Sequence, residues 1–407
     1  MENRYDKYKD SGIAWIGEIP EHWEITSFKR KITINNGKDY KDFLDAEIYP
    51  VMGSGGCFAY CSNYMYDGEA LLLGRKGTID KPLYVKGKFW AVDTMFYAIP
   101  HANLDCKFAY YLALMFPFNL YSTSTSLPSL TQTDLGNILV AFPFLSEQQS
   151  IATYLDQKCG EIDELITLQE EMITKLQSYK QSVITEAVTK GLDKNVPLKD
   201  SGIEWIGNTP EHWNKNKIIR LFGIIGSGTT PKSSKEDNYI GSVNWIQSGD
   251  INGGYIESCK NTISDTALKE YTTLKIYKAP FIIIAMYGAS VGNISISNID
   301  GCVNQACCVM NETKQNFKYL FYAMNSVKKY LIYKAEGGGQ PNISQDKIKN
   351  TWLPIPPLSE QQSIANYLDQ KCSEIDELIS IKQQKIEKLK DYKKSLIFEC
   401  VTGKRKV

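Results

Sequence analysis

Two of the three histidines in this 407-residue chain occupy equivalent positions in a repeated motif, and they are its first candidates for acid–base chemistry. His22 lies in the tetrapeptide PEHW at 20–23, and His212 lies in the same tetrapeptide at 210–213. Imidazole changes protonation near neutral pH, so either ring could act as a general base. Each ring, however, lies between a proline and a tryptophan. We therefore interpret both histidines as packed or capping residues.

Other catalytic signatures are missing from the sequence. It contains no Walker A loop, no GxSxG and no HExxH. The heptapeptide GSGTTPK at 226–232 has the glycines of a phosphate loop but not its Gly-Lys-Ser/Thr ending. The ten cysteines lack the paired CxxC spacing of zinc sites, so we expect them to be reduced and buried, with no metal bound. We therefore predict that this chain is not itself an enzyme.

Two long amphipathic segments are expected to position the rest of the chain. Residues 145–191 and 358–403 repeat each other at an offset of 213, with polar interruptions at Lys158, Gln169, Lys371 and Lys382. Ser146 with Gln149 predicts a capping box, and Gly191 predicts the helix end. We expect two helices, each roughly 60 Å long, to pack antiparallel. The predicted contact seam comprises Ile151, Leu155, Ile162, Leu165, Met172, Leu176, Tyr179 and Val183, and then Ile364, Leu368, Ile375, Leu378, Leu389, Tyr392 and Leu396.

A second repeat precedes each globular part of the chain. KDSGIAWIGEIPEHW at 9–23 returns as KDSGIEWIGNTPEHW at 199–213, whereas the globular parts that follow look largely unrelated in sequence. A duplicated frame that holds two divergent inserts suggests one task performed twice on two different targets. The predicted domains are 1–23, 24–144, 145–191, 192–213, 214–357 and 358–407: docking segment, globular domain and long helix, twice over.

The inserts alternate β-forming runs with glycine-rich turns, as at 50–56, 70–79 and 88–99 in the first and 242–251, 280–296 and 302–310 in the second. A short helix follows in each, at 106–116 and 316–333. The predicted fold class is α+β: two mixed α/β domains separated by two long antiparallel coiled-coil helices, with a pseudo-twofold internal repeat.

Composition permits a nucleic-acid partner without requiring one. Hydrophobic residues make up 43% and charged residues 23%, as in ordinary folded proteins, and the formal net charge is zero. Residues 214–357 nevertheless carry 16 Lys/Arg against 10 Asp/Glu, while 145–190 carry 4 against 8. No apolar run suits a signal peptide or membrane span, so we expect a cytoplasmic protein.

These motifs carry a family resemblance. Motifs in both inserts and in both helices resemble the specificity subunit of type I restriction-modification systems. They are GSGG, GRKGTI and KFWAVDTMFY in the first insert, WIQSGDI, YGASVG and GGGQPNISQDKI in the second, and P-x-x-SEQQ-x-IA-x-YLD in the two helices. The resemblance covers nearly the whole chain. It implies that two target-recognition domains each bind one half of a split sequence in double-stranded DNA, while the helices fix their spacing.

The resemblance also implies partners and cofactors. The helices would dock two modification subunits that methylate adenine, and restriction subunits would join them. A methyltransferase needs a cofactor loop and an Asn/Asp-Pro-Pro-aromatic motif, but the one Pro-Pro, at 356–357, is followed by Leu-Ser. S-adenosylmethionine, ATP and Mg²⁺ are therefore expected only on partner subunits. The predicted docking residues are Trp15, Trp23, Ile166, Ile173, Trp205, Trp213, Ile379 and Ile386.

Candidate DNA contacts are side chains that can bond base edges or phosphates. Arg75 and Lys76 interrupt an apolar strand before a glycine, and Gln340 and Asn342 follow three glycines. Asp250 is expected to cap a turn. The first-domain candidates are Ser54, Arg75, Lys76, Lys86, Lys88, Ser124 and Thr125, and the second-domain candidates are Thr229, Thr230, Lys232, Gln247, Ser248, Tyr287, Gln340 and Asn342. A coiled-coil adaptor whose domains bind proteins instead of DNA remains the alternative.

Overall fold

The computed structural model describes residues 4–122, 128–335 and 342–407, which form two compact units. Unit 1 comprises Met1–Glu171 and Lys382–Val407, and unit 2 comprises Met172–Ile381. The helices α3 (Leu145–Lys190) and α7 (Leu358–Val401) each contribute one part to each unit. The predicted α+β class is confirmed, since each of two mixed-sheet domains is followed by one long helix.

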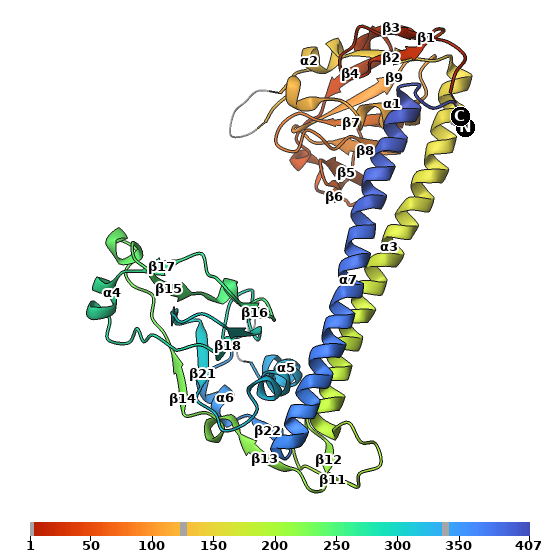
Figure 1. Ribbon diagram of the computed structural model, residues 1–407. Coiled ribbons are helices and arrows are strands. Elements are labelled where there is room, and N and C mark those ends of the chain that lie inside the picture. The colour runs from red at the N-terminus through yellow and green to blue at the C-terminus, as the bar shows by residue number, and fades with distance from the viewer. Residues whose placement is uncertain (1–3, 123–127, 336–341) are drawn as a thin grey trace. The chain divides into compact units, whose positions relative to one another are not determined.

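The first mixed-sheet domain, in unit 1, contains a six-stranded sheet in the order β4-β9-β7-β8-β5-β6 (Figure 1). Neighbouring strands are antiparallel except for β5 and β8, which are parallel. Its strands are β4 (Ile32–Asn36), β5 (Tyr49–Gly53), β6 (Gly56–Cys61), β7 (Tyr66–Gly74), β8 (Leu83–Ala91) and β9 (Met95–Pro100).

The second mixed-sheet domain, in unit 2, repeats this topology. Its five-stranded sheet has the order β14-β21-β18-β19-β16, again antiparallel except for the last pair. Five strands of the two domains therefore correspond in order and direction, although the sequences diverge. The strands are β14 (Ile224–Ser227), β16 (Tyr255–Ile256), β18 (Phe281–Ala285), β19 (Ile294–Ser297) and β21 (Cys307–Asn311).

The second domain has an additional layer. A three-stranded sheet of β15 (Val243–Ile246), β17 (Thr262–Ile263) and β20 (Cys302–Val303) encloses its own small core with α4 (Asp265–Glu270). The short 3₁₀ helices η5 (Glu236–Tyr239) and η6 (Ser248–Asp250) also belong to this region. Asp250 caps the turn as predicted, because its carboxylate accepts the Gln247 amide at 2.8 Å.

The remaining elements also occur in corresponding pairs. The helices α1 (Cys106–Ala113) and α2 (Gln132–Asn137) of unit 1 match α5 (Phe317–Tyr333) and α6 (Gln345–Asn350) of unit 2. Two-stranded sheets pair β1 (Tyr8–Asp10) with β2 (Glu18–Pro20), β3 (Glu24–Ser27) with β10 (Leu139–Phe142), β11 (Leu198–Asp200) with β12 (Asn208–Pro210), and β13 (Asn214–Lys217) with β22 (Trp352–Ile355). The other 3₁₀ helices are η1 (Phe28–Arg30), η2 (Lys41–Phe43), η3 (Phe118–Leu120) and η4 (Ile218–Arg220).

Each unit is held together by its own apolar core. In unit 1, buried residues of β7 and α1 pack with the first turns of α3 and the last turns of α7. In unit 2, β18, whose five residues are all buried, packs with α5 and the opposite ends of the same two helices. Burial of this apolar surface is the main free energy that attaches each sheet domain to the helices.

Most of the predicted helix seam is buried or half-buried, but four of its residues are not. Leu165, Tyr179, Leu378 and Tyr392 are exposed. Gln169, which we predicted as a polar interruption, and Ile386, which we predicted to face a partner, are buried instead. Ile166, Ile173 and Ile379, which we predicted to face a partner, are half-buried at intervening seam positions. Adjacent apolar pairs such as Leu165–Ile166 fit two registers, and the polar Gln169 hid the correct one.

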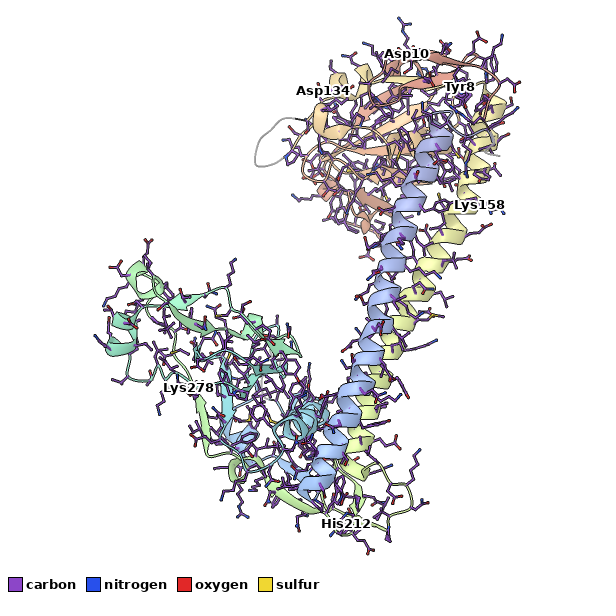
Figure 2. All side chains as sticks on the ribbon, in the orientation of Figure 1. Tyr8, Asp10, Asp134, Lys158, His212 and Lys278 are labelled. Carbon is purple, nitrogen blue, oxygen red and sulfur yellow. The ribbon has the colours of Figure 1, made fainter. Side chains whose placement is uncertain are left out.

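Two other predictions about the helices are revised. Lys158 lies on α3 (Figure 2), where its ammonium pairs with Glu161 at 2.7 Å, and Lys371 pairs in the same way with Glu374. The helix begins at Leu145, so Ser146 lies inside its first turn. Gln148 stabilises this helix start instead, donating to the Pro143 carbonyl at 2.9 Å and accepting the Asp105 amide at 2.9 Å. Gly191 ends α3 as predicted, with φ of +76°.

The repeated tryptophans join the helix ends within each unit. Trp23 and Trp213 are only 0% and 2% exposed, which leaves them no surface for a partner. The indole of Trp23 donates to Glu147 at the start of α3, and that of Trp213 donates to Glu360 at the start of α7. Trp15 and Trp205 are also packed against the cores of their own units. These four residues therefore have structural roles inside the chain.

Candidate nucleic-acid interface

In each mixed-sheet domain, four segments distant in sequence meet at one end of the sheet, which we call the loop edge. In the first domain these are the end of β4, the end of β7, the start of β9 and the segment that enters α2. In the second they are the end of β14, the end of β18, the start of β21 and the segment that enters α6. The sheet fixes the positions of these segments, and the segments themselves are exposed turns. Such turns on a rigid scaffold are common locations for binding residues.

Backbone hydrogen bonds hold the first loop edge together. The Arg75 amide, just after β7, donates to the Thr94 carbonyl at 2.8 Å, just before β9. The Arg75 carbonyl accepts the Leu130 amide at 3.0 Å, in the segment that enters α2. The loop after β4 joins the same edge, because the Lys38 amide donates to the Ala91 carbonyl at 2.9 Å.

The second loop edge has the same hydrogen bonds at corresponding residues. The Met286 amide donates to the Ala306 carbonyl at 2.7 Å, and the Met286 carbonyl accepts the Ile343 amide at 2.8 Å. Met286 therefore corresponds to Arg75, Ala306 to Thr94, and Ile343 to Leu130. A Cβ at either Gly37 or Gly228 would collide with the backbone opposite, at 2.0 Å from the Val92 carbonyl oxygen or 1.6 Å from that of Val303. Glycine is therefore required where each loop leaves the edge.

Arg75 and Lys76 are the first-domain candidates that lie on the loop edge. Arg75 is half-buried, with its guanidinium 5.8 Å from the Phe96 ring centroid and a bond of 3.3 Å to the Asp93 carbonyl. Lys76 is exposed, and its backbone forms an isolated antiparallel β-bridge with Ser129. Ser124 and Thr125 fall outside the described residues.

The remaining first-domain candidates have other partners. Lys86 pairs with Glu69 at 3.0 Å, and Lys88 lies 4.6 Å from the centroid of the Tyr64 ring. Ser54 lies in the turn between β5 and β6, on the far side of the sheet order from β4. None of these three contacts the loop edge through a hydrogen bond found among the described residues.

In the second domain, Thr229, Thr230, Tyr287 and Asn342 lie on the loop edge. The Thr229 hydroxyl is 2.6 Å from that of Thr273, while Thr230 donates to the side-chain oxygen of Gln305. Tyr287 is half-buried and directly follows Met286. Asn342 is exposed beside Ile343, and Gln340 falls outside the described residues.

Three second-domain candidates serve the neighbouring turns. The Lys232 amide donates to the Tyr271 hydroxyl at 3.1 Å, and Gln247 starts the turn that Asp250 caps. Ser248 accepts the Ser290 hydroxyl through its carbonyl at 2.7 Å. The Ser248 contact stabilises the loop after β18, whereas the other two lie in the additional layer.

Four loop-edge residues were missed by sequence reasoning. Lys38, Asp39 and Asp93 are exposed on the first loop edge, and Gln305 is exposed on the second. Asp93 directly precedes Thr94, and Gln305 directly precedes Ala306. Because Thr94 and Ala306 correspond, Asp93 and Gln305 occupy the same position in the two domains. The available sequence signal was Gly37, which directly follows β4 and precedes Lys38. A glycine, Gly228, also directly follows the corresponding strand β14.

The two loop edges differ in their electrostatics. The first carries Lys38, Arg75 and Lys76 with Asp39 and Asp93, whereas the second presents mainly hydroxyls and amides. Amide donation from Lys41 lowers the pKa of Asp39, which therefore stays ionised at neutral pH. Burial raises the pKa of Tyr287, so its hydroxyl keeps its proton and can donate a hydrogen bond. The two edges would therefore recognise different chemical groups.

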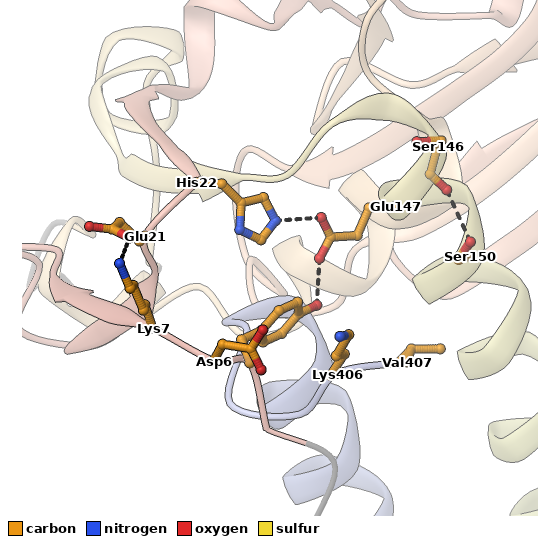
Figure 3. A pocket seen from close by; sticks show the side chains of 10 residues that line it. Asp6, Lys7, Glu21, His22, Ser146, Glu147, Ser150, Lys406 and Val407 are labelled. Carbon is orange, nitrogen blue, oxygen red and sulfur yellow. Dashed lines mark hydrogen bonds and ion pairs between the residues drawn. The ribbon is translucent and has the colours of Figure 1, made fainter.

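The repeated histidines contact the helix starts. Figure 3 shows the His22 ring facing the Glu147 carboxylate. His22 Nε2 lies 2.8 Å from Oε2 of that carboxylate. Tyr5 donates to its Oε1 at 2.5 Å. His212 lies 2.7 Å from Glu360 in the same way. Each of these contacts joins a PEHW motif to a glutamate in the first turn of a long helix. Within the described part of the chain, no group of three or more His, Cys, Asp or Glu comes together as a metal site, and no helix is long and apolar enough to cross a membrane.

An exposed apolar patch recurs on the helices. Leu165, Leu168 and Tyr392 are 43%, 43% and 52% exposed in unit 1. Their counterparts at the offset of 213 are Leu378, Ile381 and Tyr179, which are 47%, 53% and 59% exposed in unit 2. Large apolar side chains that remain on a helix surface at repeated positions mark a candidate protein contact.

Comparisons with known proteins agree on one family. The family model described as type I restriction modification DNA specificity domain matches residues 20–177 and 210–391. A putative type I restriction enzyme MjaX specificity subunit from Methanocaldococcus jannaschii is 26% identical, over 96% of each chain. The EcoDI specificity subunit of Escherichia coli is 20% identical, over 95% of this chain and 89% of its own. A chain from a structural study of type I R-M complex assembly and conformational transition superposes with a TM-score of 0.73 at 17% identity, covering 94% of this chain and 98% of its own.

Proposed function

Because the chain belongs to the type I restriction modification DNA specificity family, we propose that its two loop edges each recognise one half of a bipartite DNA target. The chain is the DNA sequence-specificity subunit of a type I restriction-modification complex and is itself non-catalytic. The domains that would carry the two half-sites are residues 24–144 and 214–357, and the long helices serve as the spacer between them.

The correspondence of the two loop edges supports this division. The same turns, held by the same backbone hydrogen bonds, present charged side chains in one domain and neutral polar side chains in the other. Base edges in the major groove differ in their pattern of donors and acceptors, so different side chains on one scaffold select different bases. Phosphate contacts from lysines such as Lys38 and Lys76 would position the first domain without adding sequence information.

The apolar patches support two partner subunits per chain. The helices repeat Leu165, Leu168 and Tyr179 as Leu378, Ile381 and Tyr392, so each unit presents one patch of two aliphatic residues and a tyrosine. Two closely similar patches fit two copies of one partner, here the modification subunit, which would carry S-adenosylmethionine. Restriction subunits would join this assembly with ATP and Mg²⁺.

Half-site mapping tests the proposed division of labour. The assembled complex is incubated with random duplex DNA, and the retained molecules are sequenced. Replacing Arg75 and Lys76 with alanine is expected to relax one half-site only, and replacing Thr230 and Asn342 is expected to relax the other. Equal changes in both half-sites would contradict the proposal. Retention without any sequence preference by the unmodified complex would favour the protein-adaptor alternative.

A further inference from the structure

The turn before β9 and the turn before β21 each hold an exposed polar side chain at the same place. In the first domain it is Asp93, and in the second it is Gln305. The registers Gly74 with Met95 and Ala285 with Cys307 establish this correspondence. Both turns also close with the same backbone bond, Met95 to Val92 at 2.9 Å and Cys307 to Asn304 at 3.2 Å.

The Gln305 amide is oriented by Thr230, whose hydroxyl donates to the side-chain oxygen of Gln305. An uncharged carboxamide has two N–H donors and two acceptor positions. Because the Gln305 side chain is exposed, an N–H donor and one oxygen lone pair remain for a ligand. Adenine presents that complementary pair, the N6 donor and the N7 acceptor, in the major groove.

Asp93 has different chemistry at the same place. Its carboxylate offers acceptors only, and the pairing at a base edge that suits a carboxylate is the amino group of cytosine. A carboxylate near phosphates is repelled unless a cation is close, and Arg75 supplies one, with its guanidinium bonded to the Asp93 carbonyl at 3.3 Å. Arginine is itself the commonest partner of the guanine that pairs with cytosine.

We propose that this turn position selects one base pair in each half-site, with Gln305 recognising an A·T pair and Asp93, beside Arg75, recognising a C·G pair. The inference rests on the proposed function and adds base identities to it. Thr230 is a positioning residue that holds the Gln305 amide.

Sequencing of DNA retained by the assembled complex tests the assignment. Gln305→Ala is expected to lower discrimination for adenine at one position of one half-site by roughly 10- to 100-fold, the usual worth of a good bidentate contact. Gln305→Glu keeps the shape but removes the N–H donors, so the preference at that position should move from adenine to cytosine. Asp93→Ala should relax one C·G position in the other half-site. Thr230→Val removes the hydroxyl that holds the Gln305 oxygen and should weaken the adenine preference by a few-fold without replacing it.

Asn298→Ala is the matched control for Gln305, because Asn298 is an exposed amide beyond β19, at the opposite end of the sheet from the loop edge. It should leave both half-sites unchanged. The inference is overturned if Gln305→Ala and Gln305→Glu both leave the bound sequences unaltered, or if they alter the half-site that Asp93 affects. In either case the unmodified complex would still recognise two half-sites. Failure of the proposed function is distinguishable, because the unmodified complex would then show no sequence preference.

Discussion

Lys180 Nζ lies 2.7 Å from both carboxylate oxygens of Asp376, and the same contact recurs between Lys393 and Asp163 with the helices exchanged. In unit 2 the lysine belongs to α3, and in unit 1 it belongs to α7. Each lysine and each aspartate is displaced from its counterpart by 213 residues. A slipped pairing of the helices would separate these opposite charges, so the two contacts specify the antiparallel register.

Reversing the charge of Lys180 is expected to destabilise unit 2. Reversing the charge of Asp376 as well is expected to recover most of the lost stability. In Lys180→Asp two carboxylates would face each other, whereas Lys180→Asp with Asp376→Lys restores the attraction. Because both side chains are partly exposed, the coupling energy should be about 0.5 to 1 kcal/mol. A double-mutant cycle in denaturant unfolding measures it. A coupling energy near zero would show that the seam alone sets the register.

The glycines that end the long helices are expected to tolerate alanine unequally. Both have φ in the left-handed region, at +76° for Gly191 and +72° for Gly403, which costs alanine roughly 1 to 2 kcal/mol. A Cβ at Gly403 would also lie 2.3 Å from Pro20, whereas one at Gly191 would lie 3.1 Å from the Trp213 ring. Gly403→Ala should therefore destabilise the protein more than Gly191→Ala.

Gly160→Ala provides the control for these two variants. This glycine is inside α3, and nothing lies within 4 Å of the site of an added Cβ. Alanine there should stabilise the protein by about 0.5 to 1 kcal/mol, because glycine is the poorer helix former. Denaturant unfolding gives the three values. A stabilising effect of Gly403→Ala would contradict the close contact with Pro20.

Thiol chemistry should distinguish Cys57 from the other nine cysteines. Cys57 is exposed, and eight others are buried. Burial raises the pKa of Cys302 to about 11 and that of Cys106, Cys308 and Cys400 to about 12. At pH 8 one thiol should react rapidly with a maleimide, and Cys57→Ser should abolish that reaction. Rapid labelling of several sites would contradict the buried positions.

The same raised values predict a pH dependence of stability. A thiol with a raised folded pKa holds its proton after the unfolded chain, whose thiols titrate near 9.0, has begun to lose protons. This contribution to stability is present below about pH 9 and is lost as pH rises toward the folded values. Unfolding midpoints measured between pH 8 and 10 should therefore decrease.

Sequence alone could supply the repeated frame, the fold class and most of the helix seam, but not the loop edges. The frame is visible because PEHW and SEQQ recur, and the hydrogen bonds of His22 and Trp23 to Glu147 explain why these motifs accompany each other. The seam prediction was wrong at Leu165 because Leu165 and Ile166 are both apolar, and burial depends on which one the neighbouring helix covers.

The loop edges failed for another reason. Asp93 and Gln305 share no sequence context, and their correspondence emerges only when β7 pairs with β9 and β18 with β21. Strand register depends on contacts between segments far apart along the chain, which a single sequence does not reveal. Arg75 was found because it breaks an apolar run, a signal that Gln305 lacks.

The apolar patches are expected to hold one partner each. Leu165→Glu with Leu168→Glu should remove one modification subunit, and Leu378→Glu with Ile381→Glu should remove the other, because buried carboxylates without partners are costly at an interface. Native mass spectrometry of the assembled complex reports the count. Ile240→Glu, at a residue that is 73% exposed outside the helices, is the control. Loss of both subunits from one patch variant would contradict the assignment.

The account rests most directly on helices that set the spacing between two half-sites. Seven residues inserted both after Gln169 in α3 and after Lys382 in α7, whose side chains meet at 3.4 Å, would lengthen both helices at one level and keep the seven-residue pattern in register. The addition is about 10 Å along the axis, or about three base pairs of B-DNA. Sequencing of retained DNA should show both half-sites unchanged and the unspecified spacer longer by two or three base pairs. An unchanged spacer, or altered bases in either half-site, would contradict the account.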